Sequence, residues 1–427
     1  MDYMKIRCSL LVALLCLLPA GIHAAKKASS NDWPQWRGPN RDGISPESDL
    51  LDEWPKDGPP LAFKATGLGG GYSSVAVAGG KVYTLGSRGG KEHLTALDTA
   101  DGKVLWSAPI GGGDHSNGTP TVDGERVYAI GLRGDLVCAN VADGAIVWKK
   151  NFAQDFGGKM MSGWGFSESP LIDGDRLICT PGGNDAMIVA LDKMTGDTVW
   201  QAAMPGNVGP RGQDGAGYSS IVVSHGAGVK QYVQLIGRGV IGVRAEDGEM
   251  LWGYNRIANG TANIPTPLVS DDYVFCSSGY NTGAALLKLA KDGRGVKAEE
   301  RYFLEPKVMQ NHHGGMILIG KHVYCGSGHN QGFPLCVNML TGKLAWHPGR
   351  GPGQESAAIA YADGNLYFRY QNGVIALIEA TPKKYHLKST FELPGTGQPS
   401  WPHPVVAEGR LYLRDQDLLF AYDIQKK

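Results

Sequence analysis

Polar and aromatic side chains recur in short segments along most of this sequence. Twelve of them suit ligand recognition: His115, Asn117, Trp164, Glu168, Arg211, Asp214, Asn311, His312, His313, Glu355, Trp401 and His403. A Trp ring can stack on a flat ligand, while imidazole, amide, guanidinium and carboxylate groups form hydrogen bonds. We interpret these residues as candidates for one site that binds a small polar molecule or a peptide. Alternatively, the same groups satisfy one another and ordered water.

The sequence lacks the common signatures of hydrolases, nucleotide-binding loops and zinc sites. It contains no Gly-x-Ser-x-Gly, no His-Glu-x-x-His and no Cys-x-x-Cys, and its Gly-rich pieces at 67–72 and 111–115 precede strands rather than helices. A metal could be bound by His115, His403 and one of His312 and His313, but adjacent residues of a strand point to opposite faces. We predict no metal site and assign no catalytic residue.

A repeated unit must position these segments. The stretch 118–148 reads as four short strands joined by Gly-containing turns, where Gly supplies the positive φ of tight hairpins. A closing aromatic residue recurs at Trp106, Trp148, Trp200, Trp252, Phe303, Trp346 and Phe391. A four-strand unit repeated at this spacing is typical of a β-propeller. The approach segments, meaning the residues just before the first strand of each unit, then meet at one mouth of the channel.

The two ends of the repeat region indicate eight blades. Residues 405–424 supply three strands at the C-terminus, and Phe63 marks a lone outer strand near the start. Pairing that strand with the last three completes an eighth blade and removes two exposed sheet edges. We predict an all-β, eight-bladed propeller over residues 60–427, preceded by a lead-in segment at residues 25–59.

The repeat resembles the pyrroloquinoline-quinone-like (PQQ-like) propeller repeat, which quinoprotein dehydrogenases share with the assembly lipoproteins of the outer membrane. Residues 98–106 (DTADGKVLW) and 190–200 (ALDKMTGDTVW) carry the resemblance, and residues 31–47 look like the lead-in of exported PQQ-like proteins. The resemblance covers about residues 60–424. It implies the fold strongly and the function weakly, because enzymes and scaffolds both use this repeat.

For a quinoprotein dehydrogenase, the resemblance implies a Trp floor under the quinone, a carboxylate base, calcium ligands and a disulfide between adjacent cysteines. Trp164 or Trp401 would then be the floor, and Glu168 or Asp214 would be the base. The sequence departs from that pattern, because it has no adjacent cysteines and lacks the long insertions that build such active sites.

Residues 1–24 read as a secretory signal peptide. A basic start is followed by an apolar core from Cys8 to Leu18, which is too short to cross a bilayer, and Ala24 suits cleavage. Large residues precede Cys16 where a lipoprotein would have small ones, so we favour release over lipidation. No later stretch is long and apolar enough for a membrane span. We predict an exported monomer, periplasmic or secreted.

Five cysteines follow the signal peptide: Cys138, Cys179, Cys276, Cys325 and Cys336. Three of them occupy the same position of the repeat and are typical of small buried side chains between blades. Cys325 and Cys336 lie on the two strands of one hairpin. In an oxidising compartment they are candidates for a cross-strand disulfide.

Composition and missing signatures together favour a function other than catalysis. The 41 basic and 41 acidic side chains balance, which gives no electrostatic reason to expect nucleic acid as a partner. We predict a binding or scaffold protein of the cell envelope that needs no cofactor and whose partner is an envelope protein or a small polar ligand. Two alternatives stay open: an oxidoreductase of alcohols or sugars that depends on PQQ and Ca²⁺, and a PQQ-independent ligand- or sugar-binding propeller that uses the polar mouth.

Overall fold

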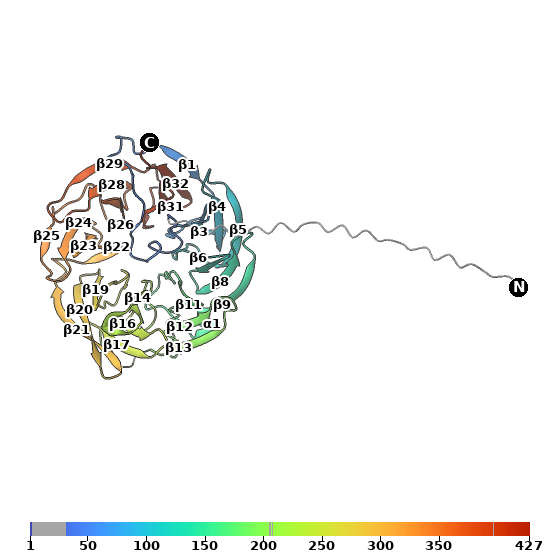
Figure 1. Cartoon of the computed structure of the whole chain (residues 1–427), viewed down its shortest axis with the longest axis vertical. Helices are drawn as coiled ribbons and strands as arrows, with labels where there is room; N and C mark the ends of the chain where they lie inside the picture. The colour runs from blue at the N-terminus through green and yellow to red at the C-terminus, as the bar shows by residue number, and fades with distance from the viewer. Residues whose placement is uncertain (2–30, 205, 207, 396) are drawn as a thin grey trace.

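A computed structural model describes residue 1 and residues 31–204, 206, 208–395 and 397–427 of the chain. The described residues form eight four-stranded antiparallel sheets arranged as a ring (Figure 1). The predicted all-β, eight-bladed propeller is therefore confirmed. The predicted signal peptide, apart from Met1, lies outside the described residues.

The blades follow chain order, and each is built from the channel outward. Their strands are β2 (Ala76–Ala78), β3 (Lys81–Arg88), β4 (Lys91–Asp98) and β5 (Val104–Gly112) in blade 1; β6 (Thr121–Asp123), β7 (Arg126–Ile130), β8 (Asp135–Asn140) and β9 (Ile146–Asn151) in blade 2; β10 (Leu171–Asp173), β11 (Arg176–Cys179), β12 (Ile188–Asp192) and β13 (Thr198–Ala202) in blade 3; β14 (Val222–Ser224), β15 (Gln231–Ile236), β16 (Gly239–Arg244) and β17 (Met250–Tyr254) in blade 4; β18 (Leu268–Ser270), β19 (Tyr273–Ser278), β20 (Gly283–Asp292) and β21 (Gly295–Leu304) in blade 5; β22 (Asn311–Ile319), β23 (His322–Ser327), β24 (Phe333–Asn338) and β25 (Leu344–Trp346) in blade 6; β26 (Ala357–Ala362), β27 (Asn365–Tyr370), β28 (Val374–Glu379) and β29 (Leu387–Glu392) in blade 7; β30 (Val405–Ala407), β31 (Arg410–Asp415), β32 (Leu418–Asp423) and β1 (Leu61–Ala65) in blade 8. A short helix, α1 (Phe152–Phe156), and a 3₁₀ turn, η1 (Gly226–Gly228), complete the described elements.

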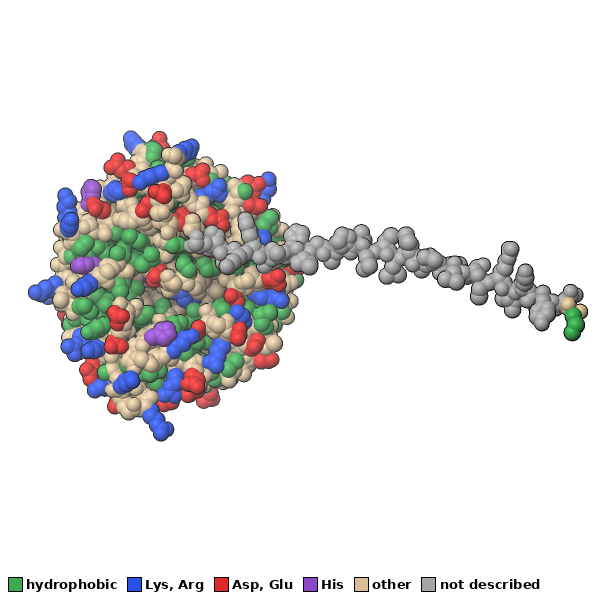
Figure 2. All heavy atoms as spheres, in the orientation of Figure 1, with side chains coloured by type: hydrophobic (Ala, Val, Ile, Leu, Met, Phe, Trp, Pro, Cys, Tyr) green, Lys and Arg blue, Asp and Glu red, His purple; other side chains and the backbone are tan. Residues whose placement is uncertain are grey.

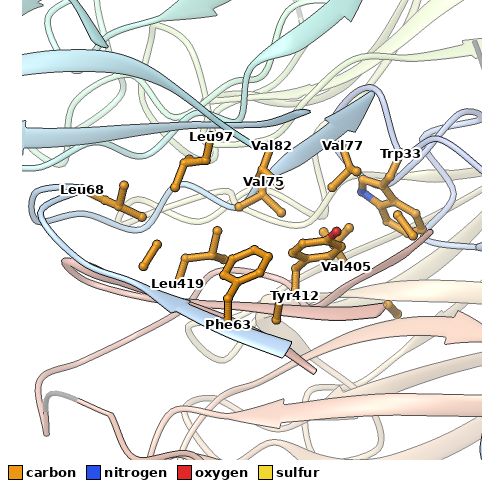
Figure 3. Close-up of a cluster of buried hydrophobic side chains, with 14 residues drawn as sticks. Trp33, Phe63, Leu68, Val75, Val77, Val82, Leu97, Val405, Tyr412 and Leu419 are labelled. Carbon is orange, nitrogen blue, oxygen red and sulfur yellow. The ribbon is translucent and has the colours of Figure 1, made fainter. Parts of the chain in front are cut away.

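The eighth blade closes the ring by joining the two ends of the chain. β1 pairs with β32 in antiparallel register, with Phe63 opposite Ala421 and Ala65 opposite Leu419. Figure 3 shows Phe63 and Tyr412 of this blade facing the side chains of blade 1 across a buried apolar cluster. The predicted closure is confirmed, and it leaves neither of these two strand edges unpaired.

In most repeats the closing aromatic residue joins its blade to the next one, whereas in blade 5 this contact is made by Tyr302, not by Phe303, with Gly342 and Met339 of blade 6. The ring of Trp106, on blade 1, covers the turn of blade 2 at Gly144, where a Cβ would lie 2.5 Å from the indole. Its Nε1 donates a 3.0 Å hydrogen bond to the carbonyl of Val141 in the same turn. Trp148 repeats both contacts with Gly196 and Lys193 of blade 3. Gly is required in these turns, because its φ is positive and a side chain would collide with the ring.

The middle strands of the blades are buried on both faces, because each blade is covered by a neighbour on either side. β7 and β8 are almost entirely buried, whereas the outer strand β9 is half exposed. This explains why the middle strands are continuous apolar runs rather than alternating ones. On the face shown in Figure 2, charged side chains of both signs are widely spread, and hydrophobic ones gather mainly left of the middle. No helix among the described residues is long and apolar enough to cross a membrane.

The lead-in segment, residues 31–59, is bound to the ring rather than hanging from it. Figure 1 shows its blue trace running from the rim into the middle of the ring. Hydrogen bonds join it to seven blades, through Trp33 to Val77, Pro34 to Val122, Arg41 to Ser169, Trp36 to Thr266, Arg37 to Met316, Ser45 to Tyr361 and Glu47 to Gly409. Since these partners lie on or beside the innermost strands, the segment crosses one end of the channel.

The five cysteines of the described chain are free and buried. Cys325 pairs with Leu335 in the register of β23 and β24, and Cys336 pairs with Tyr324, so the two cysteines are offset by one residue. Neighbouring positions of a strand face opposite sides, and the two thiols accordingly lie in different apolar clusters. The candidate disulfide between Cys325 and Cys336 is therefore absent, and the reading of small buried side chains is confirmed.

Candidate functional site

A cavity of about 370 Å³ occupies the channel between the lead-in segment and the mouth formed by the approach segments. Side chains from all eight blades and from the lead-in line it. They are Trp36, Arg37, Tyr72, His115, Asn117, Trp164, Ser167, Ser169, Tyr218, Ser220, Ala262, Ile264, Pro265, Thr266, Tyr280, His312, His313, Gly315, His329, Asn330, Gln371, Trp401 and His403. The lining is aromatic and hydroxyl- or amide-rich, which is the composition of a pocket for a polar ring.

Seven of the twelve residues singled out in the sequence meet in this cavity: His115, Asn117, Trp164, His312, His313, Trp401 and His403. They come from the approach segments of blades 2, 3 and 8 and from the start of β22 in blade 6, which the ring brings to one end of the channel. The convergence expected from the repeat is thus present for these residues.

The other five lie outside the cavity. Glu168 is buried between blades 3 and 4, where it accepts hydrogen bonds from Thr180 and Gln234. Asp214 is exposed and forms an ion pair with Arg238 at 2.7 Å. Arg211 is exposed and forms hydrogen bonds with Asn255 and Arg256. Asn311 is buried, and its side-chain amide donates to the carbonyls of Gly315 and Gly326. Glu355 is exposed. These five side chains do not line the cavity, because an approach segment can turn a side chain into the space between blades or out to solvent as readily as into the channel.

His312 and His313 both line the cavity, so the prediction that they point to opposite faces is wrong. β22 carries a bulge between Asn311 and Met316, where Gly315 has a φ of 69°. A bulge breaks the alternation of side chains along a strand. The two imidazoles therefore stack, with ring centroids 3.6 Å apart.

A chain of ring contacts extends from this histidine pair around the wall. Trp401 lies 4.5 Å from the ring of His313 and 4.2 Å from that of Tyr72. On the other side, Tyr280 lies 5.1 Å from His312 and also donates to or accepts from its Nε2 at 3.2 Å. These contacts hold the rings before any ligand arrives, which lowers the entropy cost of binding.

Three buried histidines of the wall, His312, His313 and His403, are uncharged at neutral pH. Burial lowers the pKa of His312 and of His403 to about 3, with the charge of Arg37 adding to the effect on His403. Burial lowers the pKa of His313 well below its ordinary value as well. These imidazoles thus act as hydrogen-bonding groups and ring faces rather than as cations.

The floor of the cavity is supplied by the lead-in segment. The Trp36 ring lies 4.5 Å from the His403 ring, and its Nε1 donates to Thr266 Oγ1 at 3.3 Å. Next to it, Arg37 is 2% exposed, and its guanidinium donates to the carbonyls of Asp42 and Met316. The lead-in therefore closes the channel and gives the cavity its base.

The mouth is the most open part of the site. Trp164 is 56% exposed, which is unusual for this residue type, and its carbonyl accepts a hydrogen bond from Asn117 at 3.0 Å. Its backbone N–H reaches the hydroxyl of Tyr218. An exposed Trp fixed at the rim of a cavity is well placed to cover a ligand.

Sequence reasoning missed the floor and part of the wall. Tyr280, His329, Asn330 and Gln371 come from the turns between second and third strands, which in an antiparallel blade lie at the same rim as the approach segments. That rule of topology would have found them. Tyr72 and Tyr218 stand in a repeated Gly-Tyr-Ser-Ser, at 71–74 and 217–220. Trp36 and Arg37 lie outside the repeat and carry no comparable signal.

The cavity does not fit the calcium-bound quinone of quinoprotein dehydrogenases. Calcium takes oxygen ligands, chiefly carboxylates and carbonyls, yet none of the described residues that line the cavity is Asp or Glu. Within the described part of the chain, no group of three or more His, Cys, Asp or Glu is placed to hold one metal ion. The two residues suggested as the base, Glu168 and Asp214, both lie outside the cavity.

Solved structures with the same architecture include alcohol and methanol dehydrogenases. The quinohemoprotein alcohol dehydrogenase of Comamonas testosteroni has a TM-score of 0.63 at 14% identity, covering 93% of this chain and 81% of its own. A europium-containing methanol dehydrogenase has a TM-score of 0.61 at 12% identity, covering 90% and 89%. At such low identity the likeness shows the fold alone.

Sequence comparison gives the family. The outer membrane protein assembly factor BamB of Alteromonas naphthalenivorans is 33% identical over 92 residues, which are 20% of this chain and only 22% of that protein. A family model described as outer membrane protein assembly factor BamB matches residues 48–131 and 90–347, well over half of the chain. The chain therefore belongs to this family of PQQ-like propellers.

Proposed function

We propose that this protein is an exported binding protein that holds a small polar ring compound, such as a sugar, in its central cavity without transforming it. The observation that carries the proposal is the cavity itself, closed at one end by Trp36 and Arg37 and covered at the other by Trp164. A volume of about 370 Å³ lies within the usual range of roughly 300–1,000 Å³ for small-molecule pockets.

The wall offers both parts of ring recognition. Trp36, Trp164 and Trp401 provide apolar faces for the C–H groups of a sugar ring. Asn117, Gln371 and the serine and threonine hydroxyls provide donors and acceptors for its hydroxyl groups.

Binding is favoured over catalysis by the low pKa of two buried histidines of the wall. A general base works best when its pKa is near the pH of its surroundings, but His312 and His403 have pKa values of about 3. No carboxylate among the described lining residues could replace them. These two imidazoles can therefore orient a ligand but are unsuited to take a proton from it at neutral pH.

Binding is tested by titrating the protein with D-glucose, D-galactose and their C6 carboxylates, D-glucuronate and D-galacturonate. Calorimetry and tryptophan fluorescence measure the binding. Trp164→Ala should weaken binding at least tenfold, because it removes the cover of the cavity. Its stability should stay within about 1 kcal/mol of the wild type, since the ring is exposed. Leu105→Ala, an exposed change on the outer strand of blade 1, is the matched control and should leave binding unchanged. No binding of any of the four compounds, or binding that Trp164→Ala does not affect, would refute the proposal.

A scaffold function in the cell envelope is a second candidate. It is supported by the family, whose model is described as an outer membrane protein assembly factor. It is also supported by exposed apolar side chains on the outer strands of blades 1 to 3: Val104, Leu105, Ile146, Val147 and Val199. Crosslinking in envelope extracts should capture a partner with the wild type, and a variant with Leu105 and Val147 changed to Ser should lose it. Equal capture by both would count against this surface.

Export to the periplasm or beyond is part of the same proposal. It is supported by the signal-peptide pattern at residues 1–24 and by the family to which the chain belongs. Fractionation of cells that express the C-terminally tagged full chain should place the protein outside the cytoplasm, with residues 1–24 removed. Retention of residues 1–24 on a cytoplasmic protein would refute it.

A further inference from the structure

The cavity is asymmetric in charge. Of the described residues that line it, Arg37 is the single Arg or Lys and none is Asp or Glu, while burial keeps His312, His313 and His403 uncharged at neutral pH. A cavity lined in this way has a positive potential at its floor. Such a potential favours an anion over a neutral molecule of the same shape.

The guanidinium of Arg37 is held in place by hydrogen bonds, and no carboxylate among the described lining residues faces it from the cavity. Arg37 is 2% exposed, and its Nε and Nη2 donate to the backbone carbonyls of Arg41, Asp42 and Met316. Its Nη1 has no hydrogen-bond partner. The nearby carboxylate of Asp42 faces a second hollow, on the far side of the lead-in segment. Burial lowers the pKa of Arg37 to about 10 despite the attraction of Asp42, so the cost of burying this cation is only partly offset. An anion that enters the cavity would offset more of it.

The backbone around the guanidinium is shaped to let it reach the floor. Gly315 has a φ of 69°, and a Cβ at this position would lie 2.3 Å from Arg37 Nη1 and 2.8 Å from His403 Cε1. Any side chain here would push both groups away. Only glycine therefore permits the guanidinium and the imidazole to lie together under the cavity.

The imidazole beside the guanidinium supplies an acceptor. His403 Nε2 lies 3.0 Å from the carbonyl oxygen of His313, which can only accept, so Nε2 must carry the hydrogen. In the neutral ring, Nδ1 is then an acceptor, and it has no partner. The floor thus places a cationic donor next to a neutral acceptor, which complements a carboxylate that has a hydroxyl group nearby.

We infer that the ligand of this cavity is a sugar acid, whose carboxylate lies towards Arg37 and whose adjacent hydroxyl lies towards His403. The inference rests on the proposed binding function and specifies its ligand class. The aromatic faces of Trp36 and Trp401 hold the ring, and the amides near the mouth bind the remaining hydroxyl groups.

The charge is tested on the wild-type protein with ligands of equal shape. D-Glucuronate and D-galacturonate should bind at least tenfold more tightly in calorimetry than D-glucuronamide and D-galacturonamide, in which the carboxylate is replaced by an uncharged amide. Arg37→Gln should reduce this preference to less than threefold while the amides keep their affinity. Arg294→Gln, which changes an exposed arginine outside the cavity, should retain the full preference.

The outcomes separate the two proposals. If amides and acids bind equally well and Trp164→Ala weakens both, the sugar-acid inference is wrong and the binding function stands. If Arg37→Gln fails to fold, the wild-type comparison of acid with amide still decides the matter. If neither acids nor amides bind but D-glucose or D-galactose does, only the sugar-acid inference is wrong; if none of these compounds binds, both proposals are wrong.

Discussion

Replacing Trp33 by Ala tests whether the lead-in segment is a structural part of the propeller. The Trp33 side chain is 2% exposed and belongs to the buried cluster that joins blades 1 and 8, where Figure 3 shows it beside Val77. Truncation of a buried Trp to Ala costs about 3–5 kcal/mol. A folded body of roughly 400 residues has an unfolding entropy near 0.8 kcal/mol/K, so the Tm should fall by about 4–6 °C.

The assay is thermal unfolding of the mature protein followed by calorimetry and far-UV circular dichroism. Trp164→Ala is the matched control, because it removes the same side chain at a position that is 56% exposed, and its Tm should change by less than about 1 °C. A Tm of Trp33→Ala within 1 °C of the wild type would refute the reasoning. So would a separate low-temperature transition, since the lead-in would then unfold apart from the blades.

Three further predictions follow from buried groups. Burial raises the pKa of Glu168 from 4.5 to about 8, so the folded protein binds this proton more tightly than the unfolded chain does. The resulting contribution to the free energy of unfolding is fully present below pH 4.5. It is lost as the pH rises through about 8. Relative to Glu168→Gln, the wild type should thus lose Tm between pH 5 and 8.5, and parallel pH profiles of the two proteins would contradict this. The five buried cysteines are free, so a thiol reagent should label no cysteine in the native mature protein and all five after denaturation. A count of three labelled cysteines after denaturation would indicate a disulfide. Phe63→Ala should lower the free energy of unfolding, measured with urea, by about 3–5 kcal/mol, because the Phe63 side chain is 7% exposed and packs on Gly102. A decrease below about 1 kcal/mol would show that this contact does not hold the closing blade.

Most of the fold could be predicted from the sequence, because each repeat carries its own local signals. The closing Trp106 and the turn glycine Gly144 recur at the same places in other repeats, and their contact is the one that fixes neighbouring blades. The closure by β1 followed from counting strands, since a lone strand at one end matched the three at the other. These features depend on local spacing, which a sequence states directly.

The site could be predicted only in part, because its geometry depends on departures from the repeat. Trp164 and Glu168 stand four residues apart in one approach segment, yet one side chain covers the cavity and the other is buried between blades. The direction of each is set by the turn of an irregular backbone, which no periodicity records. The bulge that brings His312 beside His313 is likewise invisible until Gly315 is seen with its positive φ.

The pairing of β1 with β32 has a consequence for the order in which this protein can fold. The backbone N–H of Gly67 bonds to the side chain of Asp417, 350 residues further along the chain, and closing a loop of that length costs about 5 kcal/mol in chain entropy. During synthesis the first strand has no partner until the last residues have emerged. Seven blades can assemble one after another through contacts between neighbours. The ring closes only when β1 pairs with β32 at the end. A chain that stops short of β30 would expose an orphan strand and an open edge, and would be prone to aggregate.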